Sequence, residues 1–126
     1  MVKTCKAYTR NPLKYSSERI GVQTGFVKVA QVSEIPAGGM KMVTLGVEEV
    51  LIANVEGKFH AIGNACTHVG GPLAEGELSG KVVTCPWHGS QFDVTNGQVV
   101  GPPARLPVPA YEVLVQGNDI MIRSRI

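Results

Sequence analysis

The sequence has few cysteines, few aromatic residues and no long apolar segment. Three cysteines among 126 residues are too few for the disulfide framework of a small secreted domain. No apolar run approaches the roughly 20 residues that a membrane-spanning helix needs, and no signal-peptide core or twin arginine stands near the first residue. These absences predict a cytoplasmic protein that makes no membrane contact.

The length and composition favour one small all-β domain. A chain of 126 residues can build a modest core, but it is too short to hold a reductase or oxygenase catalytic domain as well. Hydrophobic residues make up 44% of the chain, and 15 glycines and 8 prolines interrupt them. That mixture is typical of short strands joined by many turns.

Alternating or clustered apolar residues between turn signals predict the strands. Glu56-Gly57 and Asn96-Gly97 are hairpin turn signals, because glycine readily adopts the positive φ that such turns require. A third hairpin is expected across residues 116–118, and no helical period is present. We expect a small antiparallel β-barrel or sandwich with strands at residues 26–30, 42–45, 50–55, 59–62, 91–95, 98–100, 111–115 and 120–123.

The net charge of +2 is unevenly distributed along the chain. Residues 1–22 carry +4, so the remainder carries −2; the charged residues of this segment are Lys3, Lys6, Arg10, Lys14, Glu18 and Arg19. The segment has no interleaved aromatic residues, which favours a solvated arm over a nucleic-acid-binding face. We predict a basic arm at 1–22, one domain at 23–126, and no nucleic-acid partner.

Two short segments carry the residues with metal-binding chemistry: Cys66-Thr67-His68 and Cys85-Pro86-Trp87-His88. Each supplies one soft thiolate and one imidazole, which predicts four metal ligands, Cys66, His68, Cys85 and His88. A structural Cys₂His₂ zinc site would use the same donors. Zinc fingers, however, usually pair like ligands in each segment, whereas here each segment holds one of each type.

This C-x-H and C-x-x-H pattern is similar to the Rieske [2Fe-2S] signature, including the following glycines Gly70 and Gly89. The resemblance implies one [2Fe-2S] cluster, with the cysteines on a buried iron and the histidines on an exposed one. It also implies a cluster-binding subdomain at about residues 63–103, inserted in the β-barrel base. Pro102 and Pro103 match the proline loop that covers one side of the cluster; a simple connector into the strand at Tyr111 is the alternative.

Four further positions indicate a subclass within that family. Gly71 and Trp87 replace the two extra cysteines that form a disulfide in the high-potential members, and Trp87 is expected to pack under its neighbours as an apolar lid, or to contact a partner. Ser90 retains a hydroxyl that donates to a bridging sulfide, while Phe92 replaces a tyrosine. We expect a potential of roughly −150 to 0 mV, low in the family range.

The resemblance implies a one-electron carrier that is not itself an enzyme. A flavin-dependent reductase would supply the electron, and an oxygenase or other redox enzyme would accept it. A permanently bound small subunit of a larger redox enzyme is the alternative, and an oxygenase N-terminal domain is disfavoured because the sequence offers no two-histidine, one-carboxylate iron site. His60 is interpreted as a structural or surface residue and Cys5 as a free thiol.

Overall fold

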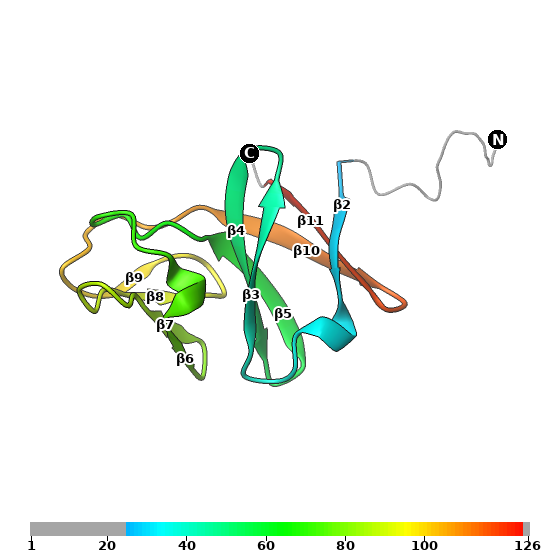
Figure 1. The fold of residues 1–126 in the computed structure, drawn as a ribbon, viewed down its shortest axis with the longest axis horizontal. Coiled ribbons are helices and arrows are strands. Elements are labelled where there is room, and N and C mark those ends of the chain that lie inside the picture. The colour runs from blue at the N-terminus through cyan, green and yellow to red at the C-terminus, as the bar shows by residue number, and fades with distance from the viewer. Residues whose placement is uncertain (1–24, 125–126) are drawn as a thin grey trace.

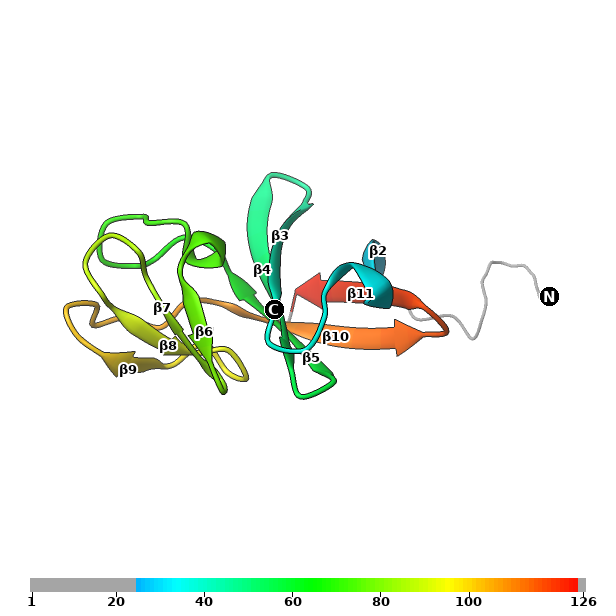
Figure 2. The same ribbon diagram turned by 60° about the horizontal axis from the view of Figure 1, so that its bottom comes forward.

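The structure, a computed structural model, describes residues 25–124. The basic arm at 1–22 and Cys5 lie outside the described residues, so the division at residue 22 stays a prediction. Ten antiparallel strands form two sheets in the described part of the chain (Figures 1 and 2). None of the described helices is long and apolar enough to cross a membrane.

The larger sheet forms the base of the molecule. Its six strands are ordered β2-β11-β10-β5-β4-β3, and the edge strands β2 and β3 contact each other, so the sheet curls into a near-barrel. The all-β base predicted from the sequence is therefore confirmed. The bounds of these strands are β2 Val27–Gln31, β3 Met40–Leu45, β4 Glu48–Val55, β5 Lys58–Gly63, β10 Ala110–Gln116 and β11 Asp119–Ser124.

The predicted hairpins at Glu56-Gly57 and around Gly117 are confirmed. Glu56 and Gly57 join β4 to β5 with φ values of 55° and 91°, and the Gly57 N–H donates to Asn54 Oδ1 at 2.7 Å. Gly117 has a φ of 60° between the paired residues Gln116 and Asp119. Both turns use the left-handed backbone that a two-residue hairpin requires.

The smaller sheet lies at one end of the molecule, beside β4 and β5 (Figures 1 and 2). Its order is β6-β7-β8-β9, with β6 Glu77–Ser79, β7 Val82–Thr84, β8 Gln91–Asp93 and β9 Val99–Gly101. Strands β8 and β9 were predicted, and β8 ends two residues earlier than expected, because Asp93 begins the turn that contains Gly97. Strands β6 and β7 were not predicted.

Strand β4 separates two hydrophobic cores. Residues 50–53 are all completely buried, and successive side chains of a strand point to opposite faces. Val50 and Ile52 pack into the interior of the near-barrel, whereas Leu51 and Ala53 pack against the smaller sheet. The second core also contains Cys66 and Cys85, so the base directly supports the two predicted thiol ligands.

Two one-turn 3-10 helices complete the fold: η2 Val32–Glu34 and η3 Leu73–Glu75. Helix η2 connects β2 to the segment that leads into β3. Helix η3 follows the first pair of predicted ligands and buries Leu73 completely in the second core. The chain therefore leaves the first ligand segment anchored to the same apolar cluster that holds both cysteines.

Candidate metal centre

The two ligand segments fold into loops with the same backbone hydrogen bonds. In ligand loop 1, residues 66–71, the Cys66 N–H donates to the Gly71 carbonyl at 2.9 Å, and the Gly70 N–H donates to the Cys66 carbonyl at 2.7 Å. In ligand loop 2, residues 85–90, Cys85 and Ser90 pair in the same way at 2.8 Å, and the Gly89 N–H donates to the Cys85 carbonyl at 3.2 Å.

The fourth residue after each cysteine needs a left-handed backbone. Gly70 has a φ of 78° and Gly89 a φ of 81°, a conformation that glycine adopts without steric cost. A Cβ at either position would meet no atom within 4 Å, so backbone conformation rather than space accounts for these glycines. The loops therefore hold the two cysteines at equivalent backbone positions.

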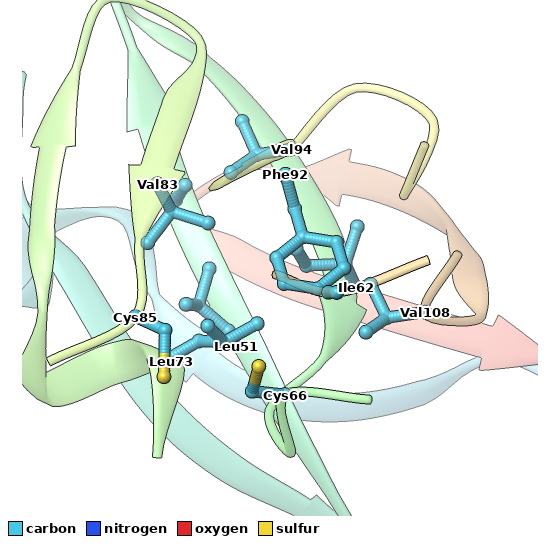
Figure 3. Close-up of a cluster of buried hydrophobic side chains, with 11 residues drawn as sticks. Leu51, Ile62, Cys66, Leu73, Val83, Cys85, Phe92, Val94 and Val108 are labelled. Carbon is cyan, nitrogen blue, oxygen red and sulfur yellow. The ribbon is translucent and has the colours of Figure 1, made fainter. Parts of the chain in front are cut away.

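The two thiols are buried and the two imidazoles are exposed. Cys66 and Cys85 are 3% and 2% exposed, and both are free cysteines. Their sulfurs lie on the same side of an apolar cluster that includes Leu51 and Leu73 (Figure 3). His68 and His88 lie at the surface with ring centroids 5.3 Å apart and an interplanar angle of 80°.

These donors fit a dinuclear cluster better than a single metal ion. Among residues 25–124, no three His, Cys, Asp or Glu side chains gather closely enough to hold one ion. A tetrahedral zinc site needs its four donors around one point, whereas this chain separates a buried thiol pair from an exposed imidazole pair. Two buried soft donors and two exposed nitrogen donors suit an inner and an outer iron.

Gly71 leaves space for a sulfur of the opposite loop. A Cβ at this position would lie 2.6 Å from Cys85 Sγ and 3.2 Å from Trp87 Cδ2. Positions 71 and 87 are thus neighbours across the two loops, in agreement with the sequence interpretation that both replace members of one disulfide. The requirement for glycine here is spatial, and a second glycine directly after Gly70 was the signal available in the sequence.

Ser90 and Phe92, the two residues expected to contact the cluster, are both fully buried. The Ser90 Oγ accepts a hydrogen bond from the Ala104 N–H at 3.0 Å, so its own proton is available to donate toward the cluster. The Phe92 ring extends from β8 into the hydrophobic core that contains Cys66 (Figure 3). These positions are compatible with the contacts expected of both residues, which stay predictions.

The segment after β9 is tied to both ligand loops. Ala104 donates to Ser90 of loop 2, and the Thr67 hydroxyl of loop 1 donates to the Leu106 carbonyl at 2.6 Å. Pro102 and Pro103 lie at the surface directly before these attachments. Thr67 was not singled out in the sequence, because a hydroxyl that bonds a carbonyl 39 residues away leaves no local pattern.

The predicted packing of Trp87 under its neighbours is wrong. Its indole is 56% exposed, although one edge of the ring lies over Gly71. Val69, within loop 1, is 45% exposed, and Leu106, whose carbonyl bonds Thr67 of loop 1, is 66% exposed. Because Val69 follows His68 and Trp87 precedes His88, apolar side chains flank both imidazoles at the surface.

His60 lies on β5, away from the ligand loops in the sequence, and is half-buried. Burial lowers the pKa of its imidazole, nearby Lys58 lowers that pKa further, and Asp93 opposes the change. The pKa of Asp93 itself is lowered: burial acts to raise it, but hydrogen bonds from Thr95 and contact with Lys81 outweigh burial. A neutral, structural His60 agrees with this environment.

Comparison with known proteins places these features in context. Residues 25–112 match the Rieske [2Fe-2S] domain family. The chain is 37% identical over 98 residues to the biphenyl dioxygenase ferredoxin subunit of Pseudomonas sp. strain KKS102, covering 77% of this chain and 90% of that protein. It is 35% identical over 96 residues to apoptosis-inducing factor 3 of Mus musculus, covering 76% of this chain but 16% of that protein.

Solved structures show the same fold. The ferredoxin of carbazole 1,9a-dioxygenase from Nocardioides aromaticivorans IC177 superposes with a TM-score of 0.77 at 29% identity, covering 81% of this chain and all of that one (100%). A ferredoxin chain in the complex of reduced oxygenase and oxidized ferredoxin in carbazole 1,9a-dioxygenase also gives 0.77, at 28% identity with 81% and 97% coverage.

Proposed function

The chain belongs to the Rieske [2Fe-2S] domain family, and we propose that it is a soluble one-electron carrier that delivers electrons to an oxygenase. One [2Fe-2S] cluster is its cofactor, and Cys66, His68, Cys85 and His88 are the proposed ligands. When bound, the cluster supplies the site that takes up and releases one electron. The dioxygenase ferredoxin components to which the chain is similar over most of their length support this proposal.

The combination of an exposed imidazole pair with two buried thiols is the observation that carries the proposal. His68 and His88 lie 5.3 Å apart at the surface, so a partner protein can approach them directly. The two thiols are buried in the hydrophobic core, so the inner side of the site is shielded from water. Val69, Trp87 and Leu106 offer a small apolar rim, which suits a brief encounter better than a permanent subunit interface.

We propose a flavin-dependent reductase as the donor, and the cytoplasm as the location in which donor, carrier and acceptor meet. An oxygenase acceptor has the stronger support, because the similar ferredoxin of carbazole 1,9a-dioxygenase is found in complex with its oxygenase. The same histidine-bearing end would serve both partners in turn. The carrier itself holds electrons and catalyses no substrate conversion.

Electron paramagnetic resonance of the dithionite-reduced protein tests the cofactor assignment. Mixed nitrogen and sulfur ligation should give an average g value below that of four-cysteine clusters. Cys66→Ser is the matched control and should lose the signal, because a neutral hydroxyl is a poor ligand for the buried iron. A wild-type sample that gives no resonance signal after reduction and contains stoichiometric zinc would contradict the assignment.

Electron transfer to the terminal oxygenase of a carbazole 1,9a-dioxygenase tests the carrier role. Reduced protein should be oxidised by this probe in a saturable reaction that Trp87→Ala slows and that Val47→Ala leaves unchanged. Val47 is a suitable control because its side chain is fully exposed, at 100%, in the turn between β3 and β4. A stable complex that elutes as one species during size exclusion would favour a permanent subunit instead.

A further inference from the structure

The two ligand loops are closed at their bases in different ways. Loop 2 continues directly into the β7–β8 ladder, in which Thr84 pairs with Gln91 and Val83 with Phe92. Loop 1 has no such ladder, because β5 ends at Gly63. The strand-type pairing behind loop 1 is a single isolated bridge between Ala65 and Pro72, and proline has no N–H to contribute.

Hydrogen bonds made by Asn64 close the base of loop 1, where this strand ladder is missing. This side chain is 3% exposed. Its backbone carbonyl accepts the Leu73 N–H at 2.8 Å, and its side-chain Oδ1 accepts the next N–H, that of Ala74, also at 2.8 Å. Asn64, two residues before Cys66, therefore binds the N–H groups of Leu73 and Ala74, which begin two residues after Gly71.

Asn64 is also fixed to the base of the molecule. Its backbone N–H donates to the Glu49 carbonyl at 3.0 Å, and its Nδ2 lies 3.5 Å from Glu49 Oε1. Glu49 belongs to β4, the strand that separates the two cores. Asn64 therefore links strand β4 of the larger sheet to the segment that follows loop 1, and it does so from the segment that precedes loop 1.

We propose that Asn64 is a positioning residue for ligand loop 1, and that its side-chain amide holds Cys66 and His68 in the arrangement that the cluster requires. The proposal rests on the assignment of these two residues as ligands. Removing the amide leaves the partly buried Ala74 N–H without an acceptor and opens the base of loop 1. Loop 2 keeps its strand ladder and should not respond.

Hydrogen exchange of the full-length, cluster-loaded protein, measured by mass spectrometry, provides the test. In Asn64→Ala, the Cys66 and Gly70 amides should exchange roughly tenfold faster or more, while the Cys85 and Gly89 amides keep the wild-type rate. The g values and the reduction potential should also change. Loop 2 serves as the control within the same molecule.

Asn54→Ala is the matched control variant. Asn54 is 6% exposed, donates to the Ile35 carbonyl at 2.8 Å and accepts from the Gly57 N–H at 2.7 Å, so it makes comparable bonds in the base. Its removal should lower the free energy of unfolding without changing the g values or the potential. Asn64→Asp combined with Glu49→Gln keeps the Oδ1 acceptor and should restore slow exchange in loop 1.

Equal acceleration of both loops, or of neither, would overturn the proposal and leave Asn64 an ordinary structural residue. If Asn64→Ala does not fold, Asn64→Ser, which removes less of the side chain, allows the same comparison of the two loops. If the wild-type protein binds no cluster, the ligand assignment fails. Exchange in the metal-free full chain still reports whether Asn64 closes loop 1, so the two failures are distinguishable.

Discussion

Gly71→Ala should weaken cluster binding without weakening the metal-free fold. The added Cβ would lie 2.6 Å from Cys85 Sγ, whereas ordinary contacts begin at 3.4 Å, so the sulfur must move by about 0.8 Å (3.4 minus 2.6). In the metal-free protein, the Cys85 side chain can rotate away at little cost. When the sulfur is bound to iron, the same movement must distort the site.

The size of the effect follows from the cost of overpacking. Inserting one carbon into a filled site costs about 1 to 3 kcal/mol, which corresponds to a roughly 5- to 150-fold loss of cluster affinity. The backbone of Gly71 lies outside the positive-φ region, so alanine introduces no backbone strain. In the metal-free state, alanine should even stabilise slightly, because it restricts the unfolded chain.

Gly76→Ala is the matched control. Its Cβ would lie 1.9 Å from the Thr84 carbonyl oxygen, a backbone atom that cannot rotate away. This variant should therefore destabilise both the metal-free and the loaded protein in urea unfolding. Metal-free Gly71→Ala should be as stable as wild type or slightly more stable, whereas the loaded variant should show rapid bleaching of the cluster absorbance in the presence of an iron chelator. Wild-type bleaching kinetics in Gly71→Ala would refute the reasoning.

Two further predictions concern Phe92 and His60. Phe92→Tyr adds a hydroxyl at a fully buried position. If this hydroxyl forms a hydrogen bond of about 0.5 to 1.5 kcal/mol to the reduced cluster, voltammetry should show a reduction potential raised by roughly 20 to 65 mV. If the hydroxyl has no partner, the free energy of unfolding should fall by about 1 to 3 kcal/mol. Burial lowers the pKa of His60 in the folded protein, so the unfolded chain takes up a proton on this imidazole at a higher pH than the folded protein does. The contribution of neutral His60 to stability is therefore present above about pH 6.5 and is lost as the pH falls below it. His60→Gln should therefore lose less free energy of unfolding than wild type between about pH 7.5 and 5, and identical slopes would contradict this assignment.

The sequence predicted the base of the fold well, because its strands are long enough to show their pattern. Residues 50–53 are a continuous apolar run and a hairpin glycine follows at 57, which is what a strand buried on both faces requires. Strands β6 and β7 have three residues each, too few to show alternation. They form because β7 pairs with β8 and because Val83 is drawn into the core beneath the thiols.

Candidate ligands could be identified from residue type and spacing, whereas their supports could not. Thr67 and Asn64 act through partners that are distant in the sequence or belong to the backbone, so neither leaves a local signature. Trp87 was misjudged for a different reason. A large aromatic residue is usually buried by its neighbours, but Pro86, His88 and Gly89 beside this one are themselves exposed, and Gly71, which its ring contacts, has no side chain.

The two loops have equivalent backbones, but their closing residues differ because each residue has different surroundings. Gly71 and Ser90 each accept the N–H of the cysteine five positions earlier, so they occupy the same place in their loops. At the first position, the absence of a side chain makes room for the sulfur of the opposite loop. At the second, a fully buried hydroxyl bonds Ala104 and anchors the segment that follows the proline loop. Exchanging the two residues would place a Cβ 2.6 Å from Cys85 Sγ and remove the anchor at Ala104, so the closing residues of the two loops cannot be interchanged.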